Sequence, residues 1–123
     1  MVKITHVNFD YFYPFIQDAK KSGLAFSNST QYYACFDNDD LVGLCGIVWY
    51  KDCVKFKNDY VIPKYRGKGY FKAMMDYRIN LILQKNIRKI KACCTDMSLK
   101  EYMKRGGIIQ KQYKACTDII IDL

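Results

Sequence analysis

The run from Val61 to Phe71 constrains this chain most, because a strand-like segment there meets two closely spaced glycines and then a helical pattern. A strand, a glycine loop and a helix start in this order direct free backbone N–H groups and the positive end of the helix dipole at one place. Gly67 and Gly69 let the backbone approach a ligand closely because neither carries a Cβ, and Arg66 and Lys68 add positive charge. The run therefore predicts a site for a phosphate-bearing ligand.

The same run resembles the acyl-CoA-binding signature of the GNAT N-acyltransferase superfamily, Arg/Gln-x-x-Gly-x-Gly/Ala preceded by Val-x-Pro-x-Tyr. The matching positions are Val61, Pro63, Tyr65, Arg66, Gly67, Lys68 and Gly69. Phe71 departs from the family, which usually has Gly or Ala there, so its ring either narrows the pyrophosphate loop or points into the core. The resemblance implies acetyl-CoA as the co-substrate, bound by Tyr60, Val61, Arg66, Gly67, Lys68, Gly69, Tyr70, Phe71 and Lys72.

The composition is that of a globular protein. The 123 residues are 50% hydrophobic and 26% charged, which predicts one domain, residues 1-123, with a sizeable core. No apolar run approaches the roughly 18–20 residues of a membrane span, and the N-terminal residues lack the apolar centre of a signal peptide. We therefore expect a cytoplasmic protein without a membrane segment.

The cysteines show no C-x-x-C spacing, and most lie in apolar, strand-like runs: Cys35, Cys45, Cys53, Cys93, Cys94 and Cys116. We interpret them as reduced core thiols, in preference to disulfides or a zinc site. The one histidine, His6, cannot complete a Cys/His metal set of the usual spacing, so no metal is predicted. A covalent acyl-cysteine route is disfavoured, because no histidine lies near Cys93 or Cys94 in the sequence to activate a thiol.

Apolar alternation and helical periodicity predict the order of the elements. Strands are expected at 2–7, 31–36, 41–50, 53–62 and 88–94, one or two more at 108–123, and helices from 8 or 10 to 21, from 71 to about 85, and at 99–105. This order fits an α/β single domain with a GNAT-like mixed, mostly antiparallel sheet of about six to seven strands flanked by about three helices. The family usually has two helices between the first two strands, where only one is expected here.

A second family match lies downstream, at Tyr102, Lys104 and Gly106. These residues resemble the family's Tyr-Glu-Lys-x-Gly-Phe segment, in which the tyrosine of many members donates a proton to the leaving CoA thiolate. A phenol at a helix start can supply that proton. The resemblance therefore implies a catalytic role for Tyr102.

Tyr102 also has a purely structural interpretation. Ser98 and Glu101 have the spacing of a capping box for a helix at 99–105, and Met97 and Tyr102 stand at the two hydrophobic-staple positions. In that case the ring of Tyr102 only fixes the start of the helix.

Acyl transfer to an amine requires a neutral nitrogen, and a lysine-like amine has a pKa near 10.4. Asp59, on the strand that leads to Val61, is the candidate base, and a β-bulge there would aim it into the cleft. The alternatives are that Asp59 faces solvent on its strand and that ordered water removes the proton.

The formal charge is +8, from 20 Lys and Arg against 12 Asp and Glu, and only part of it suits an anionic cofactor. We predict an acetyl-CoA-dependent N-acetyltransferase acting on an amine, which is either a small molecule or a protein lysine. One alternative is a phage-type nucleobase-modifying relative that contacts nucleic acid through Arg88, Lys89, Lys91, Lys100, Lys104 and Arg105. Another is a degenerate CoA-binding module, and both a monomer and a homodimer are compatible with the sequence.

Overall fold

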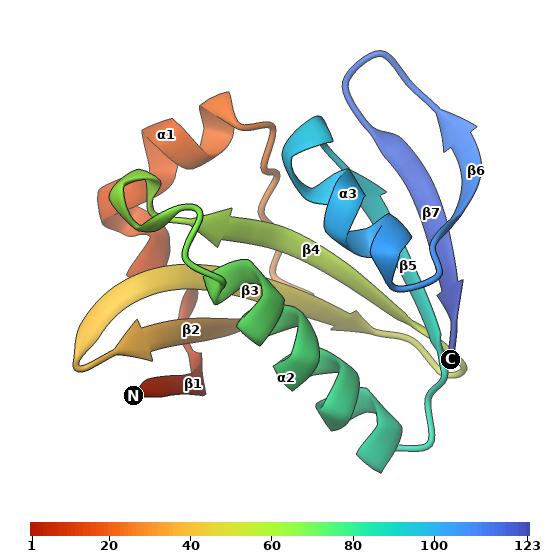
Figure 1. Cartoon of the computed structure of the whole chain (residues 1–123), viewed down its shortest axis with the longest axis horizontal. Coiled ribbons are helices and arrows are strands. Elements are labelled where there is room, and N and C mark those ends of the chain that lie inside the picture. The colour runs from red at the N-terminus through yellow and green to blue at the C-terminus, as the bar shows by residue number, and fades with distance from the viewer.

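A computed structural model describes residues 1–123. Seven strands form one sheet in the order β1-β2-β3-β4-β5-β7-β6 (Figure 1). The strands are β1 Val2–Val7, β2 Gln31–Asp37, β3 Asp40–Trp49, β4 Val54–Val61, β5 Lys89–Cys94, β6 Ile108–Gln112 and β7 Thr117–Asp122. The helices are α1 Ile16–Lys21, α2 Tyr70–Gln84 and α3 Asp96–Lys104, with short 3₁₀ turns η1 at Phe9–Phe15 and η2 at Pro63–Tyr65. None of these helices is both long and apolar enough to cross a bilayer.

The sheet is mixed and mostly antiparallel, which confirms the predicted fold class. Only β4 and β5 pair in parallel, because α2 connects them as a crossover. The β2–β3 hairpin turns at Asn38 and Asp39, whose φ angles of 50° and 75° suit a two-residue hairpin loop.

Each face of the sheet carries its own hydrophobic core, because successive strand residues point to opposite faces. On one face, Met74 and Ile82 of α2 and Tyr102 of α3 pack against the strands. On the other face, Phe12 of η1 and Ala19 of α1 do the same. The sheet is therefore the middle layer, with the glycine loop leading into the helix on the first face (Figure 1).

The expected β-bulge is present in β4. Leu44 pairs with Tyr60, and Gly46 pairs with Lys57. Two residues of β4, Asn58 and Asp59, lie between these pairs and therefore face only one residue of β3. Asn58 takes a left-handed conformation with a φ of 59°. A bulge shifts the side-chain alternation by one residue, and Asp59 consequently points to the α2 face.

The parallel pairing of β4 and β5 is short. It comprises Val54 with Ile90, Lys55 with Lys91 and Phe56 with Ala92, and it ends there, although β4 continues for another five residues, to Val61. The two strands therefore separate toward their C-terminal ends. This splay leaves main-chain groups of β4 without a strand partner on one edge, directly before the glycine loop.

The segment between β1 and β2 differs from the expectation of one helix. It divides into η1 and α1, because Pro14 has no N–H to continue an α-helical ladder and locks the local φ. The predicted inward side is partly correct: Phe12 and Ala19 are buried, while Phe15 and Ile16 are half-buried.

The predicted capping box at Ser98 is wrong, because α3 begins at Asp96 with Thr95 as its N-cap residue. The Ser98 hydroxyl donates to the Thr95 carbonyl, and Glu101 pairs with Arg105 instead of returning to the helix start. Met97 is 64% exposed, so the hydrophobic staple is absent as well. Tyr102 therefore lies in the last part of the helix rather than at its start.

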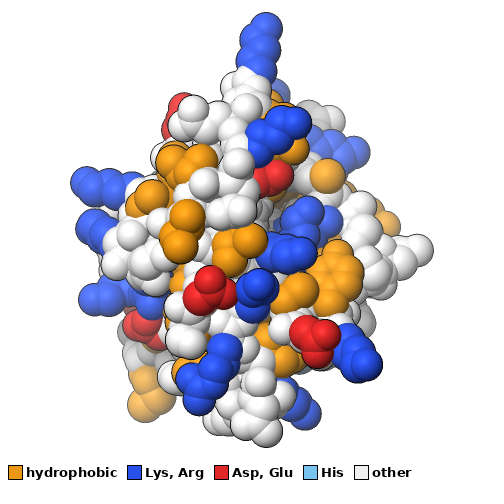
Figure 2. All heavy atoms as spheres, turned by 90° about the vertical axis from the view of Figure 1, so that its right-hand side faces the viewer, with side chains coloured by type: hydrophobic (Ala, Val, Ile, Leu, Met, Phe, Trp, Pro, Cys, Tyr) orange, Lys and Arg blue, Asp and Glu red, His pale blue; other side chains and the backbone are white.

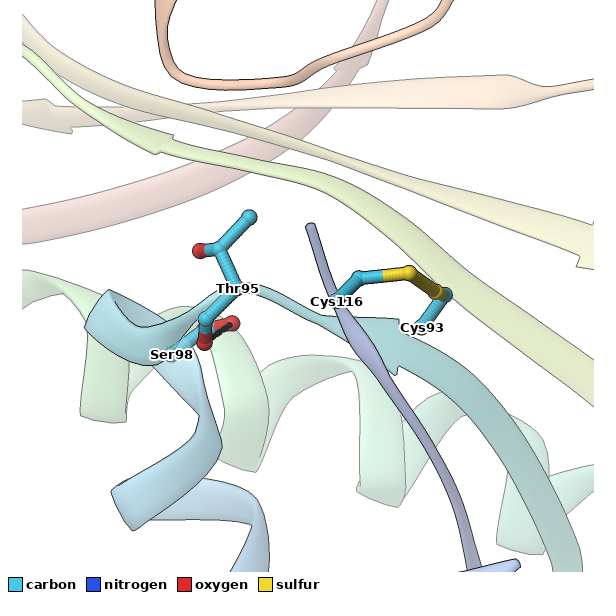
Figure 3. The surroundings of a disulfide bond; sticks show 4 residues. All are labelled: Cys93, Thr95, Ser98 and Cys116. Carbon is cyan, nitrogen blue, oxygen red and sulfur yellow. Dashed lines mark hydrogen bonds between the residues drawn. A yellow bond between two sulfur atoms is a disulfide. The ribbon is translucent and has the colours of Figure 1, made fainter. Parts of the chain in front are cut away.

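The prediction that all cysteines are reduced is also wrong. Cys93, on β5, and Cys116, just before β7, form a disulfide (Figure 3). Antiparallel pairing of Cys94 with Thr117 brings the two cysteines together, and no local spacing signals that pairing. The bond argues against the expected cytoplasmic location, because reducing compartments keep most protein thiols free.

We expect reduction of this disulfide to lower the free energy of unfolding by about 3 kcal/mol, the typical contribution for a loop of this length. Urea melts with and without reductant measure the change, and the double variant Cys93→Ser/Cys116→Ser should lose its sensitivity to reductant. Cys53→Ser, at a half-buried free thiol, is the matched control. Alkylation of the unfolded, unreduced chain should label four cysteines, and labelling of all six would contradict the bond.

Candidate active site

A cavity of about 290 Å³ opens where β4 and β5 separate. Its walls come from the end of β4, the glycine loop, the first turn of α2 and the start of α3. All nine predicted cofactor residues except Lys68 line it. The wall also includes residues that the cofactor prediction did not contain: Ser22, Leu24, Asp59, Tyr65, Thr95, Met97, Ser98 and Glu101.

The glycine loop has the conformation that the sequence requires. Gly67 and Gly69 have φ angles of +80° and +88°, in the left-handed region that other residues rarely adopt. A Cβ at either position would meet no atom within 4 Å, so the surface of the loop is open at both glycines. The N–H groups of Gly67, Lys68 and Gly69 make no backbone hydrogen bond. Together with the start of α2, they form a cluster of donors suited to an anion.

Arg66 is held against the strand that precedes it. Its Nε donates to the Val61 carbonyl at 2.8 Å, and its guanidinium lies 5.6 Å from the ring centre of Tyr60. The Tyr60 hydroxyl donates to Asp18 Oδ2 at 2.5 Å, and Arg66 Nη2 lies 3.7 Å from the same carboxylate oxygen. Arg66 therefore lines the cavity as a fixed charge, tied to both β4 and α1.

Phe71 lines the cavity and also packs against the core. Its ring centre lies 6.1 Å from that of Tyr102, and it contacts the cluster beneath α2. The ring therefore lies between the cavity and the buried tyrosine.

Beneath the cavity, three side chains form a buried polar network. Arg78 of α2 is fully buried, and its Nη2 lies 2.6 Å from Asp59 Oδ1. The Tyr102 hydroxyl donates to the other oxygen, Asp59 Oδ2, at 2.5 Å. Arg78 also donates to the Gly46 carbonyl at 3.1 Å and lies over the ring of Phe56. Asp59 alone of the three reaches the cavity wall.

The ionisation of this network follows from its burial and its charges. Burial alone would lower the pKa of Arg78, but the Asp59 carboxylate outweighs it and holds that pKa above its ordinary value. Burial, with the Asp59 charge beside it, raises the pKa of Tyr102 well above the ordinary value for a phenol. Tyr102 therefore keeps its proton at neutral pH and acts only as a donor.

Arg78 was missed by the sequence analysis, although a signal for it existed. It follows Met74 and Met75 by four and three residues, so it stands on the apolar face of α2. A charge at that position predicts a buried partner of opposite sign.

The two cysteines near the cleft offer no reactive thiol. Cys93 is part of the disulfide and has no free thiol, and burial raises the pKa of Cys94 to about 12. A thiol that stays protonated is a poor nucleophile, so neither cysteine is suited to form a covalent intermediate.

A second cavity, of about 280 Å³, lies on the other side of the splay. Both cavities are lined by Leu24, Asp59, Thr95 and Ser98, so they meet at these four residues. The second cavity is further bounded by residues 23–25, by β4 residues 55–58 and by the disulfide, which Figure 3 shows beside Thr95 and Ser98. Asp59 is therefore the one ionisable residue common to both walls.

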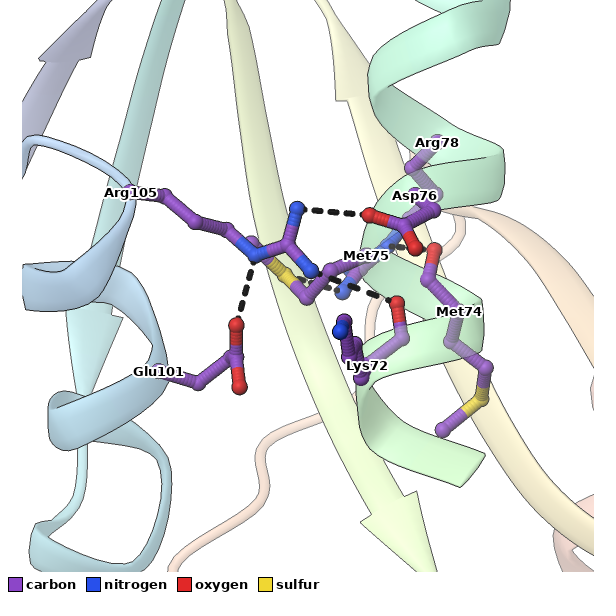
Figure 4. A network of polar contacts seen from close by, with 7 residues as sticks. All are labelled: Lys72, Met74, Met75, Asp76, Arg78, Glu101 and Arg105. Carbon is purple, nitrogen blue, oxygen red and sulfur yellow. Dashed lines mark hydrogen bonds and ion pairs between the residues drawn. The ribbon is translucent and has the colours of Figure 1, made fainter. Parts of the chain in front are cut away.

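One of the predicted nucleic-acid contacts, Arg105, is already engaged in ion pairs within the protein. Arg105 links α3 to α2, with its Nε 2.7 Å from Glu101 Oε2 and its Nη1 2.7 Å from Asp76 Oδ1 (Figure 4). Figure 2 shows Lys and Arg distributed over one face of the molecule, with apolar and acidic side chains between them. The basic residues of this face do not form one continuous surface there.

Comparison with known proteins places this geometry in a family. The family model described as Acetyltransferase (GNAT) family matches residues 3–106. The PaiA N-acetyltransferase from Thermoplasma acidophilum, solved in complex with coenzyme A, has a TM-score of 0.81 at 12% identity, over 100% of this chain and 99% of that chain. The Campylobacter jejuni N-acetyltransferase PseH, in complex with acetyl coenzyme A, has a TM-score of 0.72 at 16% identity, over 99% of each chain.

A longer protein shares the fold. The N-acetylglutamate synthase from Neisseria gonorrhoeae, complexed with coenzyme A and N-acetyl-glutamate, has a TM-score of 0.82 at 14% identity, over 100% of this chain and 35% of that chain. None of the curated proteins matches this sequence. At these identities, the likeness to solved structures shows the fold.

Proposed function

Because this chain belongs to the acetyltransferase (GNAT) family, we propose that it transfers the acetyl group of acetyl-CoA to an amine by direct attack. The observation that carries this proposal is the meeting of two cavities at Asp59, one beside the glycine loop and one on the far side of the splay. Two substrates can thus approach one reacting centre from opposite sides, and such positioning supplies a large share of the rate gain.

The loop cavity suits the cofactor. The unpaired N–H groups of residues 67–69, the start of α2 and the fixed charge of Arg66 provide donors and positive charge for the pyrophosphate. The splayed edge of β4 offers main-chain groups for the amide-bearing pantetheine arm, in the manner of an added strand. Acetyl-CoA supplies the activated acyl group as a thioester.

Asp59 and Tyr102 handle the protons in this proposal. The ammonium of the acceptor gives one proton to Asp59, directly or through water, and its nitrogen forms the C–N bond as the C–S bond breaks. The nitrogen then loses a second proton to solvent. Because Tyr102 does not line the cavity, its hydroxyl proton reaches the departing thiolate through a bridging water in this proposal, and Tyr102 regains a proton from Asp59, its hydrogen-bond partner. Of the two protons that the ammonium loses, one reaches the thiolate and one reaches solvent.

Binding of acetyl-CoA is expected to raise the melting temperature by several degrees, since a ligand at 100 times its Kd stabilises the folded state by about 2.7 kcal/mol. A thermal melt of the protein, first freed of any bound CoA, measures this shift. Arg66→Glu combined with Gly69→Asp should abolish it, because the variant places negative charge where the pyrophosphate would lie.

Lys89→Glu is the charge-reversal control for that variant, because Lys89 is exposed on β5 and lines neither cavity. It should keep the full shift. If the unmutated protein shows no shift at millimolar acetyl-CoA, the proposed function fails. If it shows a shift but no acetyl transfer to any amine, the chain is a CoA-binding module.

A further inference from the structure

Resting on the proposed function, we infer that the acceptor is a small amine that carries a carboxylate or phosphate group. The second cavity selects this class through Lys55, Lys57 and Asn58. The location of the cavity indicates where an acceptor would enter. The charged and polar groups that line the cavity indicate which acceptor it would bind.

The charge of the second cavity is positive. Its ionisable side chains are Lys55, Lys57 and Asp59, since Cys93 and Cys116 are joined in the disulfide. Asp59 lies 2.6 Å from the buried guanidinium of Arg78, which offsets its charge. Two lysines therefore remain without an acidic partner in this cavity. A polyamine or a second cationic group would be repelled there, and an anionic group would be attracted.

Lys57 is poorly solvated. Its side chain is half-buried, and burial, followed by the nearby charge of Lys55, lowers its pKa. An ammonium that has lost part of its hydration gains more from a bound anion than an exposed one does. This lysine is therefore a natural contact for an acid group.

Asn58 adds an unsatisfied acceptor to the same wall. It is only 3% exposed, and its Nδ2 donates to the Ala25 carbonyl at 2.9 Å. Since a carbonyl only accepts, this bond fixes the amide orientation and leaves Oδ1 as the free atom, for which the protein offers no partner. A buried acceptor without a donor is costly, and an N–H of the substrate amine would satisfy it next to Asp59.

The size of the cavity argues for a small molecule. A volume of about 280 Å³ lies just below the range of typical ligand sites, which suits a small metabolite. The disulfide and the β6–β7 loop close one side, with Ala115 and Cys116 in the wall.

Paired amines that differ only in the acid group test the inference. Acetylation of alanine is compared with that of alaninamide, phosphoethanolamine with ethanolamine, and putrescine represents the cationic class. The member with the acid group should have a kcat/KM roughly 10- to 100-fold higher, the range expected for a hydrogen bond between charged groups. The two pairs separate a carboxylate-bearing acceptor from a phosphate-bearing one.

Variants locate the preference in the cavity. Lys57→Gln should remove most of the difference within a pair, Lys57→Arg should restore it, and Lys89→Gln is the exposed control. The acetyl-CoA melting shift should be unchanged in all three, which separates a failure of this inference from a failure of the proposed function. Equal rates within both pairs, a preference for putrescine, or no turnover of any acid-bearing amine by CoA-competent protein would overturn the inference.

Discussion

Replacement of Arg78 by methionine is expected to lower the free energy of unfolding by about 3–5 kcal/mol, the usual cost of removing one partner of a buried ion pair. Arg78 is fully buried, and Asp59 beside it is 12% exposed, so the variant would leave a nearly buried carboxylate without its counter-charge. Urea denaturation at neutral pH measures the loss.

Two further variants sharpen this test. The double variant Arg78→Met/Asp59→Leu removes both charges and should recover much of the lost stability, because an apolar pair of similar volume often replaces a buried ion pair at little cost. Arg105→Met is the matched control, since Arg105 lies nearer the surface, where its partner Asp76 is 54% exposed, and should cost about 1 kcal/mol or less. If Arg78→Met costs no more than Arg105→Met, the buried pair contributes no more to stability than an ion pair near the surface.

Tyr102→Phe is expected to reduce kcat by a factor on the order of 10² to 10³, because it removes the proton donor to the thiolate. The ring stays, so its packing against Phe71 and the core is preserved. The KM for acetyl-CoA should change little, because Tyr102 does not line the cavity beside the glycine loop and its hydroxyl bonds only to Asp59. Steady-state kinetics with a saturating acceptor give both parameters.

The control for this variant is Tyr33→Phe, which removes a hydroxyl that donates to Gln31 at 3.0 Å, outside both cavities. It should leave kcat unchanged. A loss of less than tenfold in Tyr102→Phe would mean that Tyr102 only holds Asp59 in place. A change in the pH profile of kcat without a large loss at the optimum would lead to the same conclusion.

Much of the cavity beside the glycine loop could be predicted from the sequence, because its determinants are local. The positive φ angles of Gly67 and Gly69 are a property of glycine itself, and a strand before them and a helix after them are visible in the apolar pattern. The β2–β3 hairpin was predictable for the same reason, since Asn and Asp suit its turn.

The start of α3 shows where a local pattern was insufficient. Ser98 and Glu101 have the spacing of a capping box, yet the helix begins before them and Glu101 pairs with Arg105. Thr95 is also a favoured N-cap residue, and its carbonyl accepts hydrogen bonds from the N–H groups of Ser98 and Leu99, so the helix begins one turn earlier. Two N-cap candidates three residues apart compete, and the spacing of Ser98 and Glu101 alone does not decide between them.

The sequence by itself determined the order of the elements and the glycine loop. Through its resemblance to the GNAT family, it also indicated the class of cofactor. Only the tertiary structure decided that Arg78 pairs with Asp59, that Cys93 joins Cys116, and that a second, positively charged cavity meets the first at Asp59. The physical reason is separation along the chain. Backbone conformation depends on neighbouring residues, whereas ion pairs, disulfides and cavity walls join residues whose proximity depends on how the whole sheet is ordered.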